Sequence, residues 1–177
     1  MRWFRHADPR YAFLWECDAQ PDARWHVVGD GPVQYLADTP AGAWAELIRH
    51  EAITDPEDLA DVTRALWAIE VPDDDMATAA VPALPSPVLA GSTDSYRSCQ
   101  EEAVRLRATG ARALLAPSAA LTAGAAAAAR TDGGLRPGPA ADGRVLVLFG
   151  RRPDLDGWRV VDGGRLDPHL VDVTRPL

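Results

Sequence analysis

The sequence predicts a protein of the α/β (α+β) class, with helices packed on a twisted mixed sheet. Short apolar runs typical of buried strands alternate along the chain with two longer segments of helical periodicity. The 177 residues are 47% hydrophobic and 25% charged, which are the proportions of a globular protein with a full core. We therefore expect residues 1–177 to form a single domain.

The first third of the chain combines strands with a helix. Residues 1–38 are β-rich and end in the apolar run 33–37, which is typical of a strand. Thr39 suits the N-cap of a helix and Pro40 its first position, so a helix is predicted from there to about Ile53.

The middle third is expected to contain a strand, a long loop and an αβ unit. The strand lies late in residues 59–71. The proline density of residues 72–92 disfavours regular structure, so we expect a loop there. A helix follows over residues 95–109, and Gly110 ends it. Residues 113–116 then form a short buried strand.

The last third is less regular. Residues 119–143 are rich first in alanine and then in glycine and proline, and we expect a mobile or partly helical surface excursion. The apolar run 145–149 predicts a strand. The segments 158–161 and 170–173 are expected to add one or two more strands.

The charge balance and the apolar pattern disfavour several classes of protein. The formal net charge is −8 at pH 7, and so acidic a surface repels the phosphate backbone of nucleic acids. No window approaches about 18 uninterrupted apolar residues, so no membrane span is expected. The first ten residues lack the apolar stretch of a secretory signal, and we expect a cytoplasmic protein.

Most sequence motifs that carry chemistry are missing. All 18 basic residues are arginine, so no lysine can form a Schiff base or hold a phosphate in a P-loop. The four histidines lack metal-ligand spacing, and no metal is expected. Cys17 and Cys99 are far apart, and we expect both to be buried free thiols in a reducing cytosol.

One arrangement in the first third could form a site. Tyr35 lies 11 residues after Arg24, and Glu46 lies 11 residues after Tyr35. A hairpin followed by a helix packed on it can bring these side chains together in one cleft. Gly42 and Ala43, one helical turn before Glu46, leave space beside its carboxylate for a ligand. Spacing alone favours the structural interpretation, in which Glu46 is a helix residue at the edge of the core.

Short motifs around these residues occur in an order that resembles the RES-domain family, the toxin halves of Xre–RES toxin–antitoxin pairs. The motifs are Arg5 after an aromatic residue, Ala23-Arg24-Trp25, Val33-Gln34-Tyr35-Leu36-Ala37, Ala43-Trp44-Ala45-Glu46, Cys99-Gln100 and Leu115-Ala116-Pro117-Ser118-Ala119. The resemblance covers most of residues 1–122.

The family takes its name from an Arg, a Glu and a Ser, and these match Arg24, Glu46 and Ser118, while Tyr35 matches its active-site tyrosine. The chain departs from the family around the arginine. Asp22-Ala23 stands in place of Gly-Gly, and His26 in place of Asn.

The resemblance implies an ADP-ribosyltransferase-like fold and an activity that consumes NAD⁺ as a substrate without a metal. It also implies a partner, an Xre-type helix-turn-helix antitoxin. Any contact with DNA would then come from the antitoxin, which agrees with the acidic charge of this chain.

Under this resemblance the site residues take distinct roles. Glu46 would stabilise the ribose cation that forms when nicotinamide leaves. Arg24 would bind diphosphate or ribose oxygens, and Arg5 would be a second phosphate ligand. Tyr35 would stack on the nicotinamide ring, and Ser118 would offer its hydroxyl to ribose or amide.

Each of these residues also has a purely structural interpretation. Arg24 could be an exposed turn residue, and Arg5 part of a surface ion pair. Tyr35 could simply pack in the hairpin. Glu46 could be a solvated helix residue, and Ser118 a turn at the end of a strand.

Three functions from different classes remain open at this point. The chain could be an NAD⁺-degrading toxin enzyme, with water or phosphate as the acceptor. It could be an ADP-ribosyltransferase that modifies a protein through the same site. It could also be a non-catalytic interaction module that keeps the fold.

Overall fold

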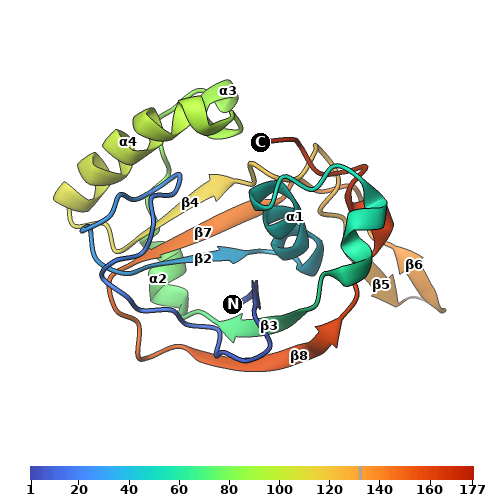
Figure 1. The fold of residues 1–177 in the computed structure, drawn as a ribbon. Helices are drawn as coiled ribbons and strands as arrows, with labels where there is room; N and C mark the ends of the chain where they lie inside the picture. The colour runs from blue at the N-terminus through green and yellow to red at the C-terminus, as the bar shows by residue number, and fades with distance from the viewer. Residues whose placement is uncertain (132) are drawn as a thin grey trace.

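A six-stranded antiparallel sheet organises the chain in the computed structural model, which describes residues 1–131 and 133–177 (Figure 1). The strand order is β4-β7-β2-β1-β3-β8. The strands are β1 (Arg2–Ala7), β2 (Val33–Ala37), β3 (Arg64–Glu70), β4 (Ala113–Pro117), β7 (Arg144–Phe149) and β8 (Asp156–Gly164). All five pairs of neighbouring strands are antiparallel, where a mixed sheet was expected. The α+β class is confirmed.

Two longer helices pack on this sheet. They are α1 (Pro40–His50) and α4 (Tyr96–Ala108). Helix α1 contacts β1 and β2, near the middle of the sheet, and α4 lies beside the β4 end together with α3 (Ser86–Leu89) (Figure 1). The apolar face of α4, with Cys99, Ala103 and Leu106, packs against buried side chains of β4 and β7.

Helix α1 begins where the sequence predicts and ends earlier. The Thr39 hydroxyl accepts a hydrogen bond from the backbone N–H of Gly42 at 3.0 Å, and Pro40 occupies the first turn. The predicted end at Ile53 is three residues too late. Ala52 adopts a left-handed conformation with φ of 52°, which stops the helix after His50.

The segment 72–92 contains two short helices, so the prediction of a structureless loop was wrong. They are α2 (Asp73–Ala77) and α3 (Ser86–Leu89). Pro72 and Pro85 each lie directly before a helix, where a missing backbone N–H costs nothing. Proline density therefore marks the starts of helices in this segment.

The segment 119–143, for which a mobile or partly helical surface excursion was predicted, contains a hairpin and a buried turn before it. Strands β5 (Ala129–Thr131) and β6 (Leu135–Pro137) pair antiparallel in a separate two-stranded sheet. Before them, Ala120, Leu121 and Ala126 are buried against Ala45 of α1. The small alanine side chains allow this segment to approach α1 closely. The predicted excursion also includes Asp132, which lies outside the described residues.

The C-terminal tail supplies one strand. The prediction at 158–161 is confirmed by β8. The strand expected at 170–173 is not formed, because Asp167 caps a 3₁₀ helix, η3 (Pro168–Leu170), and a turn follows it. Two more 3₁₀ helices are η1 (Pro56–Asp61) and η2 (Thr93–Ser95).

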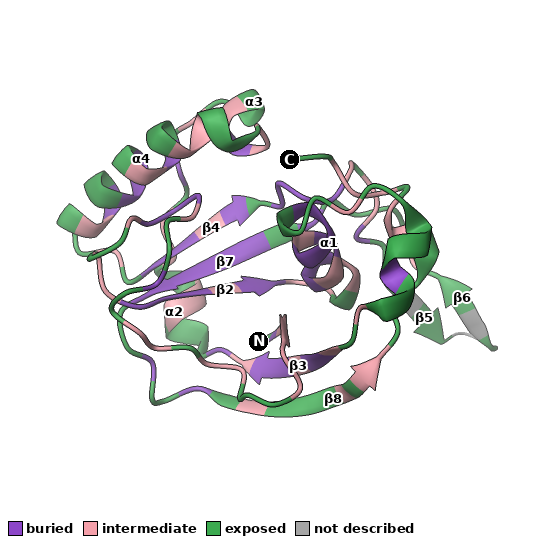
Figure 2. Ribbon diagram, in the orientation of Figure 1, coloured by how far each residue is buried: buried purple, intermediate pink, exposed green. Residues whose placement is uncertain are grey.

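Burial is concentrated in the central strands and α1, whereas β8 is largely exposed (Figure 2). Cys99 is buried as expected, while Cys17 is only half-buried, and both thiols are free. Among the described residues, no helix has the length and hydropathy needed to cross a membrane.

Candidate active site

A cavity of about 350 Å³ lies between α1, the face of β1 and β2, and the segment that precedes β2. Arg24, Tyr35 and Glu46 all line it, and so does Arg5. The side chains come from a loop, two strands and a helix, so the tertiary fold assembles this group. Its volume is within the range of small-molecule sites.

Glu46 is the carboxylate on the α1 wall of the cavity. Its Oε1 accepts a hydrogen bond from the hydroxyl of Ser118 at 3.1 Å. Burial raises the pKa of Glu46, while the Ser118 hydrogen bond and the charges of Arg49 and Arg24 oppose the rise. Its hydrogen-bond partner is neutral and the two arginines act from a distance, so the carboxylate is not committed to an ion pair.

Ser118 lies directly after β4 and stands behind Glu46. Its hydroxyl oxygen accepts hydrogen bonds from the backbone N–H groups of Ala120 (3.2 Å) and Leu121 (3.1 Å). These two donors occupy the oxygen lone pairs, so the one hydroxyl proton is donated to Glu46. Ser118 is buried, and its hydroxyl fixes the turn and orients the carboxylate.

Arg24 is buried, so the interpretation as an exposed turn residue does not hold. Its guanidinium donates to the Ser95 hydroxyl at 2.9 Å and to the carbonyl of Gly91 at 2.6 Å. The same group lies over the ring of Tyr96, 4.8 Å from the ring centre. Arg24 thereby ties the segment before β2 to the start of α4.

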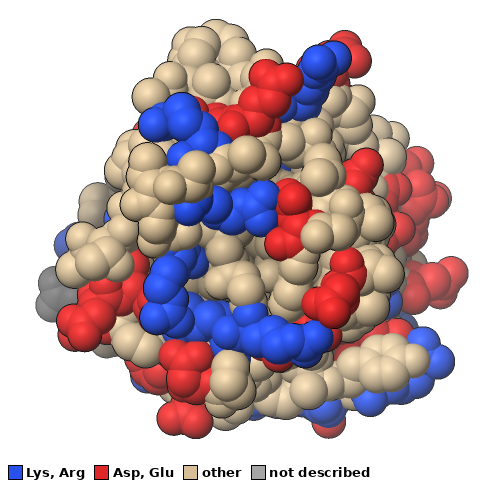
Figure 3. All heavy atoms as spheres, turned by 90° about the vertical axis from the view of Figure 1, so that its left-hand side faces the viewer, with Lys and Arg blue, Asp and Glu red and all other residues tan. Residues whose placement is uncertain are grey.

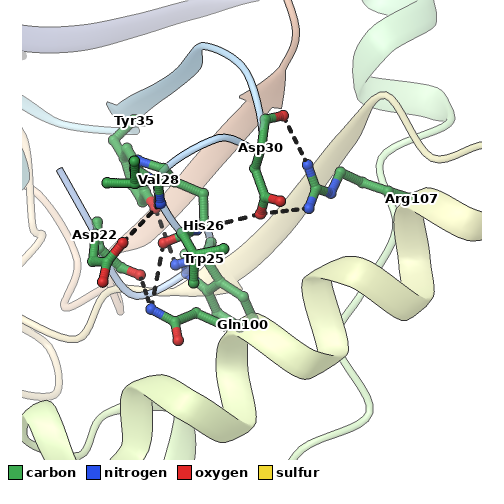
Figure 4. A network of polar contacts seen from close by, with 10 residues as sticks. Asp22, Trp25, His26, Val28, Asp30, Tyr35, Gln100 and Arg107 are labelled. Carbon is green, nitrogen blue, oxygen red and sulfur yellow. Dashed lines mark hydrogen bonds and ion pairs between the residues drawn. The ribbon is translucent and has the colours of Figure 1, made fainter. Parts of the chain in front are cut away.

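Tyr35, on β2, is fixed at its hydroxyl. The oxygen accepts from the backbone N–H of Trp25 at 3.0 Å and lies 3.1 Å from Nδ1 of His26 (Figure 4). Burial strongly raises the pKa of the Tyr35 phenol, so it is neutral at physiological pH. Burial also lowers the pKa of the imidazole of His26, which favours its neutral form.

The segment around His26 is anchored to α4 (Figure 4). The Gln100 amide donates to the carbonyls of Ala23 and His26, and Arg107 forms an ion pair with Asp30 at 2.6 Å. These contacts hold the loop that carries Arg24, although the glycine pair expected before the arginine is missing from this chain.

Arg5 reaches the cavity from β1. Its Nη1 donates to the side-chain oxygen of Gln34, so the surface ion pair considered from the sequence is not its observed contact. Burial lowers the pKa of Arg5 to about 10, and it remains positively charged at neutral pH.

The cavity residues that the sequence analysis missed include Arg49 and Tyr96. Arg49 follows Glu46 by three positions and shares its helix face, which is a signal that the sequence contained. An arginine in the last turn of a helix usually lies in solvent, so this spacing alone does not indicate a buried residue. Here Arg49 is buried and donates to the carbonyls of Ala119, Ala90 and Gly91.

The outer surface carries charges of both signs, whereas arginines predominate in the cavity. On the face shown in Figure 3, basic and acidic side chains lie beside one another. Within the cavity, three arginines surround one half-buried glutamate, while Asp22 lies exposed. Residues 1–131 and 133–177 contain no cluster of three or more His, Cys, Asp or Glu side chains suited to a metal.

Fold and cavity together define an α+β protein with an arginine-lined cavity around a single half-buried glutamate. The family model of the RES domain matches residues 2–169, so the chain belongs to the RES-domain family. A solved structure with a similar fold is described as the M. tuberculosis MbcT–MbcA toxin–antitoxin complex. The match has 16% identity and a TM-score of 0.55 and covers 97% of this chain and 86% of that chain. No curated protein matches significantly.

Proposed function

We propose that this protein is an NAD⁺-degrading toxin enzyme that cleaves the bond between nicotinamide and ribose. The observation that carries the proposal is the Glu46 carboxylate, held by the Ser118 hydroxyl and facing a cavity lined by Arg5, Arg24 and Arg49. A dinucleotide offers the complementary groups, which are a sugar that develops positive charge and a diphosphate that carries negative charge.

The reaction needs little proton transfer. When the carbon–nitrogen bond breaks, the electron pair leaves with nicotinamide, which departs as a neutral molecule, so no general acid is required. Positive charge develops on the ribose, as in glycoside hydrolysis. An ionised Glu46 stabilises this cation through space or through the ribose hydroxyls. The acceptor oxygen then bonds to the ribose carbon and loses its proton.

The other side chains position the substrate. Arg24 and Arg5 supply positive charge for the diphosphate. The hydroxyl of Tyr35 is already bonded to the backbone of Trp25, so the ring is held in place for stacking on nicotinamide. Ser118 acts through Glu46 and is a positioning residue, which departs from the substrate-binding role that the family motif implies.

A cytoplasmic enzyme that destroys NAD⁺ requires a restraint. We propose a protein partner, an Xre-type helix-turn-helix antitoxin, as the family implies. The description of the similar solved structure as a toxin–antitoxin complex supports this partner. Co-purification of a small DNA-binding protein, when the two are expressed together, tests the pairing.

The proposed reaction is tested by mass spectrometry of purified protein incubated with NAD⁺, with and without inorganic phosphate. Nicotinamide and ADP-ribose formed under both conditions indicate hydrolysis. A phosphorylated ADP-ribose formed only with phosphate indicates phosphorolysis. ADP-ribose attached to an added protein favours the transferase alternative. Intact NAD⁺ after incubation with antitoxin-free, folded protein contradicts the proposal.

A further inference from the structure

Two arginines from different elements converge on one carbonyl oxygen. Nη2 of Arg24, from the segment before β2, lies 2.6 Å from the oxygen of Gly91. Nη2 of Arg49, from the last turn of α1, lies 2.6 Å from the same oxygen. The two nitrogens are therefore separated by at most twice this distance, and both side chains line the cavity.

This pair of positive charges is buried and forms no ion pair in the described part of the chain, and the Glu46 carboxylate acts on it only from a distance. Arg24 is 8% exposed and Arg49 is 5% exposed. Every hydrogen-bond acceptor of the two guanidinium groups in the described part of the chain is a carbonyl, a hydroxyl or a thiol. Buried charges in proteins are normally paired, because removing an isolated charge from water is costly.

Arg49 has spare capacity for an anion. Its guanidinium carries five N–H groups, and its acceptors are the carbonyls of Ala119, Ala90 and Gly91. The Nε atom is buried and has no partner. Burial and the charge of Arg24 lower the pKa of Arg49 and the charge of Glu46 opposes them, so a further negative charge beside the two arginines would reduce their mutual repulsion.

We propose that Arg49 is a further anion-binding residue, and that it holds the diphosphate of the dinucleotide together with Arg24 while Arg5 adds positive charge in the same cavity. The inference rests on the proposed function for the identity of the ligand. Two guanidinium forks at this separation suit a group with two adjacent negative charges, because each fork can make paired hydrogen bonds to phosphate oxygens. A nucleoside without phosphates offers no such group.

The test measures binding of inorganic pyrophosphate and of ADP-ribose by isothermal titration calorimetry. The variants are Arg49→Met and Arg49→Lys. The control is Arg97→Gln, which removes a guanidinium that is 89% exposed on α4 and forms an ion pair with Glu101. Thermal melting establishes that each variant is folded.

For Arg49→Met we expect the dissociation constants of both ligands to rise about 10- to 150-fold, the loss typical of charge-assisted hydrogen bonds. Arg49→Lys should fall between Arg49→Met and the wild type, because an ammonium keeps the charge and loses the fork. Arg97→Gln should bind like the wild type.

Wild-type affinity in Arg49→Met overturns the inference, as does a wild-type protein that binds neither ligand. If Arg49→Met does not fold, pyrophosphate binding by Arg49→Lys within twofold of the wild type overturns it. The proposed function fails separately. If pyrophosphate binding depends on Arg49 but NAD⁺ is not cleaved, the anion site is supported and the proposed function is contradicted. If NAD⁺ is cleaved and its KM is unchanged in Arg49→Met, the anion site is contradicted and the proposed function is supported.

Discussion

Replacing Ser118 by alanine tests whether the residue behind Glu46 orients the catalytic carboxylate. The substitution removes one oxygen that makes three hydrogen bonds. It donates to Glu46 at 3.1 Å and accepts from the N–H groups of Ala120 and Leu121. Loss of the two hydrogen bonds from backbone N–H groups should affect stability, and loss of the hydrogen bond to Glu46 should affect activity.

The stability effect comes from the two backbone donors. Each N–H loses its acceptor in a buried turn, and such a loss costs about 1–3 kcal/mol when water cannot reach the group. The free energy of unfolding of Ser118→Ala, measured by chemical denaturation, should therefore fall by at least this amount. Ser118→Thr keeps the hydroxyl and serves as the matched variant.

The activity effect comes from Glu46. Without the hydroxyl, the carboxylate loses the bond that fixes its direction, and we expect kcat for nicotinamide release to fall about 10- to 100-fold, the scale of a misplacement near 1 Å. The lost bond also favours the protonated form, so the acid limb of the pH–rate profile should move to higher pH. In a Glu46→Gln background, Ser118→Ala should still reduce stability and should not reduce the residual rate further.

An unchanged kcat and an unchanged acid limb in folded Ser118→Ala would refute this reasoning. Ser118 would then only close the turn after β4, as the structural interpretation of the sequence holds.

Three further predictions concern the same cavity. Burial raises the pKa of Glu46 and the reaction needs its ionised form, so kcat should fall on acidification with a midpoint above the ordinary carboxyl pKa of about 4.3. Because the raised pKa means that the ionised carboxylate destabilises the fold at pH 7, Glu46→Gln should melt at the same or a higher temperature. Gly91→Ala places a Cβ 2.9 Å from both the carbonyl of Pro87 and the Ser95 hydroxyl, so denaturation should show a loss of about 1–3 kcal/mol and NAD⁺ should bind more weakly. Arg24→Ala should raise KM about 10- to 150-fold with a smaller effect on kcat, with partial rescue by Arg24→Lys; lost kcat at unchanged KM would place Arg24 in the chemical step.

The regular elements of the fold were predictable because their signals are local. The capped start at Thr39-Pro40 and the apolar run 145–149 each specify an element within a few residues. The segment 119–143 was not predictable, because Ala120 and Ala126 are buried in a cluster with Ala45 of α1, more than 70 positions earlier in the chain. Local composition does not predict such a long-range contact.

In the candidate site, too, some features were predictable from the sequence and others depend on long-range contacts. The spacing of Arg24, Tyr35 and Glu46 indicated a shared cleft, and all three line one cavity, although their roles remain predictions. The spacing from Glu46 places Arg49 on the same helix face, but its burial could not be predicted from the sequence, because that burial depends on the carbonyls of Ala90 and Gly91 in a distant segment.

The most direct test of the proposed function is the rate of nicotinamide release from NAD⁺ by the wild type and by Glu46→Gln, measured side by side on protein with matched melting curves. The amide keeps the size of the side chain and removes the charge that stabilises the ribose cation. We predict a loss of about 10²-fold or more in kcat with little change in KM. A Glu46→Gln rate within a few-fold of the wild type would contradict the assignment of Glu46 as the stabilising carboxylate.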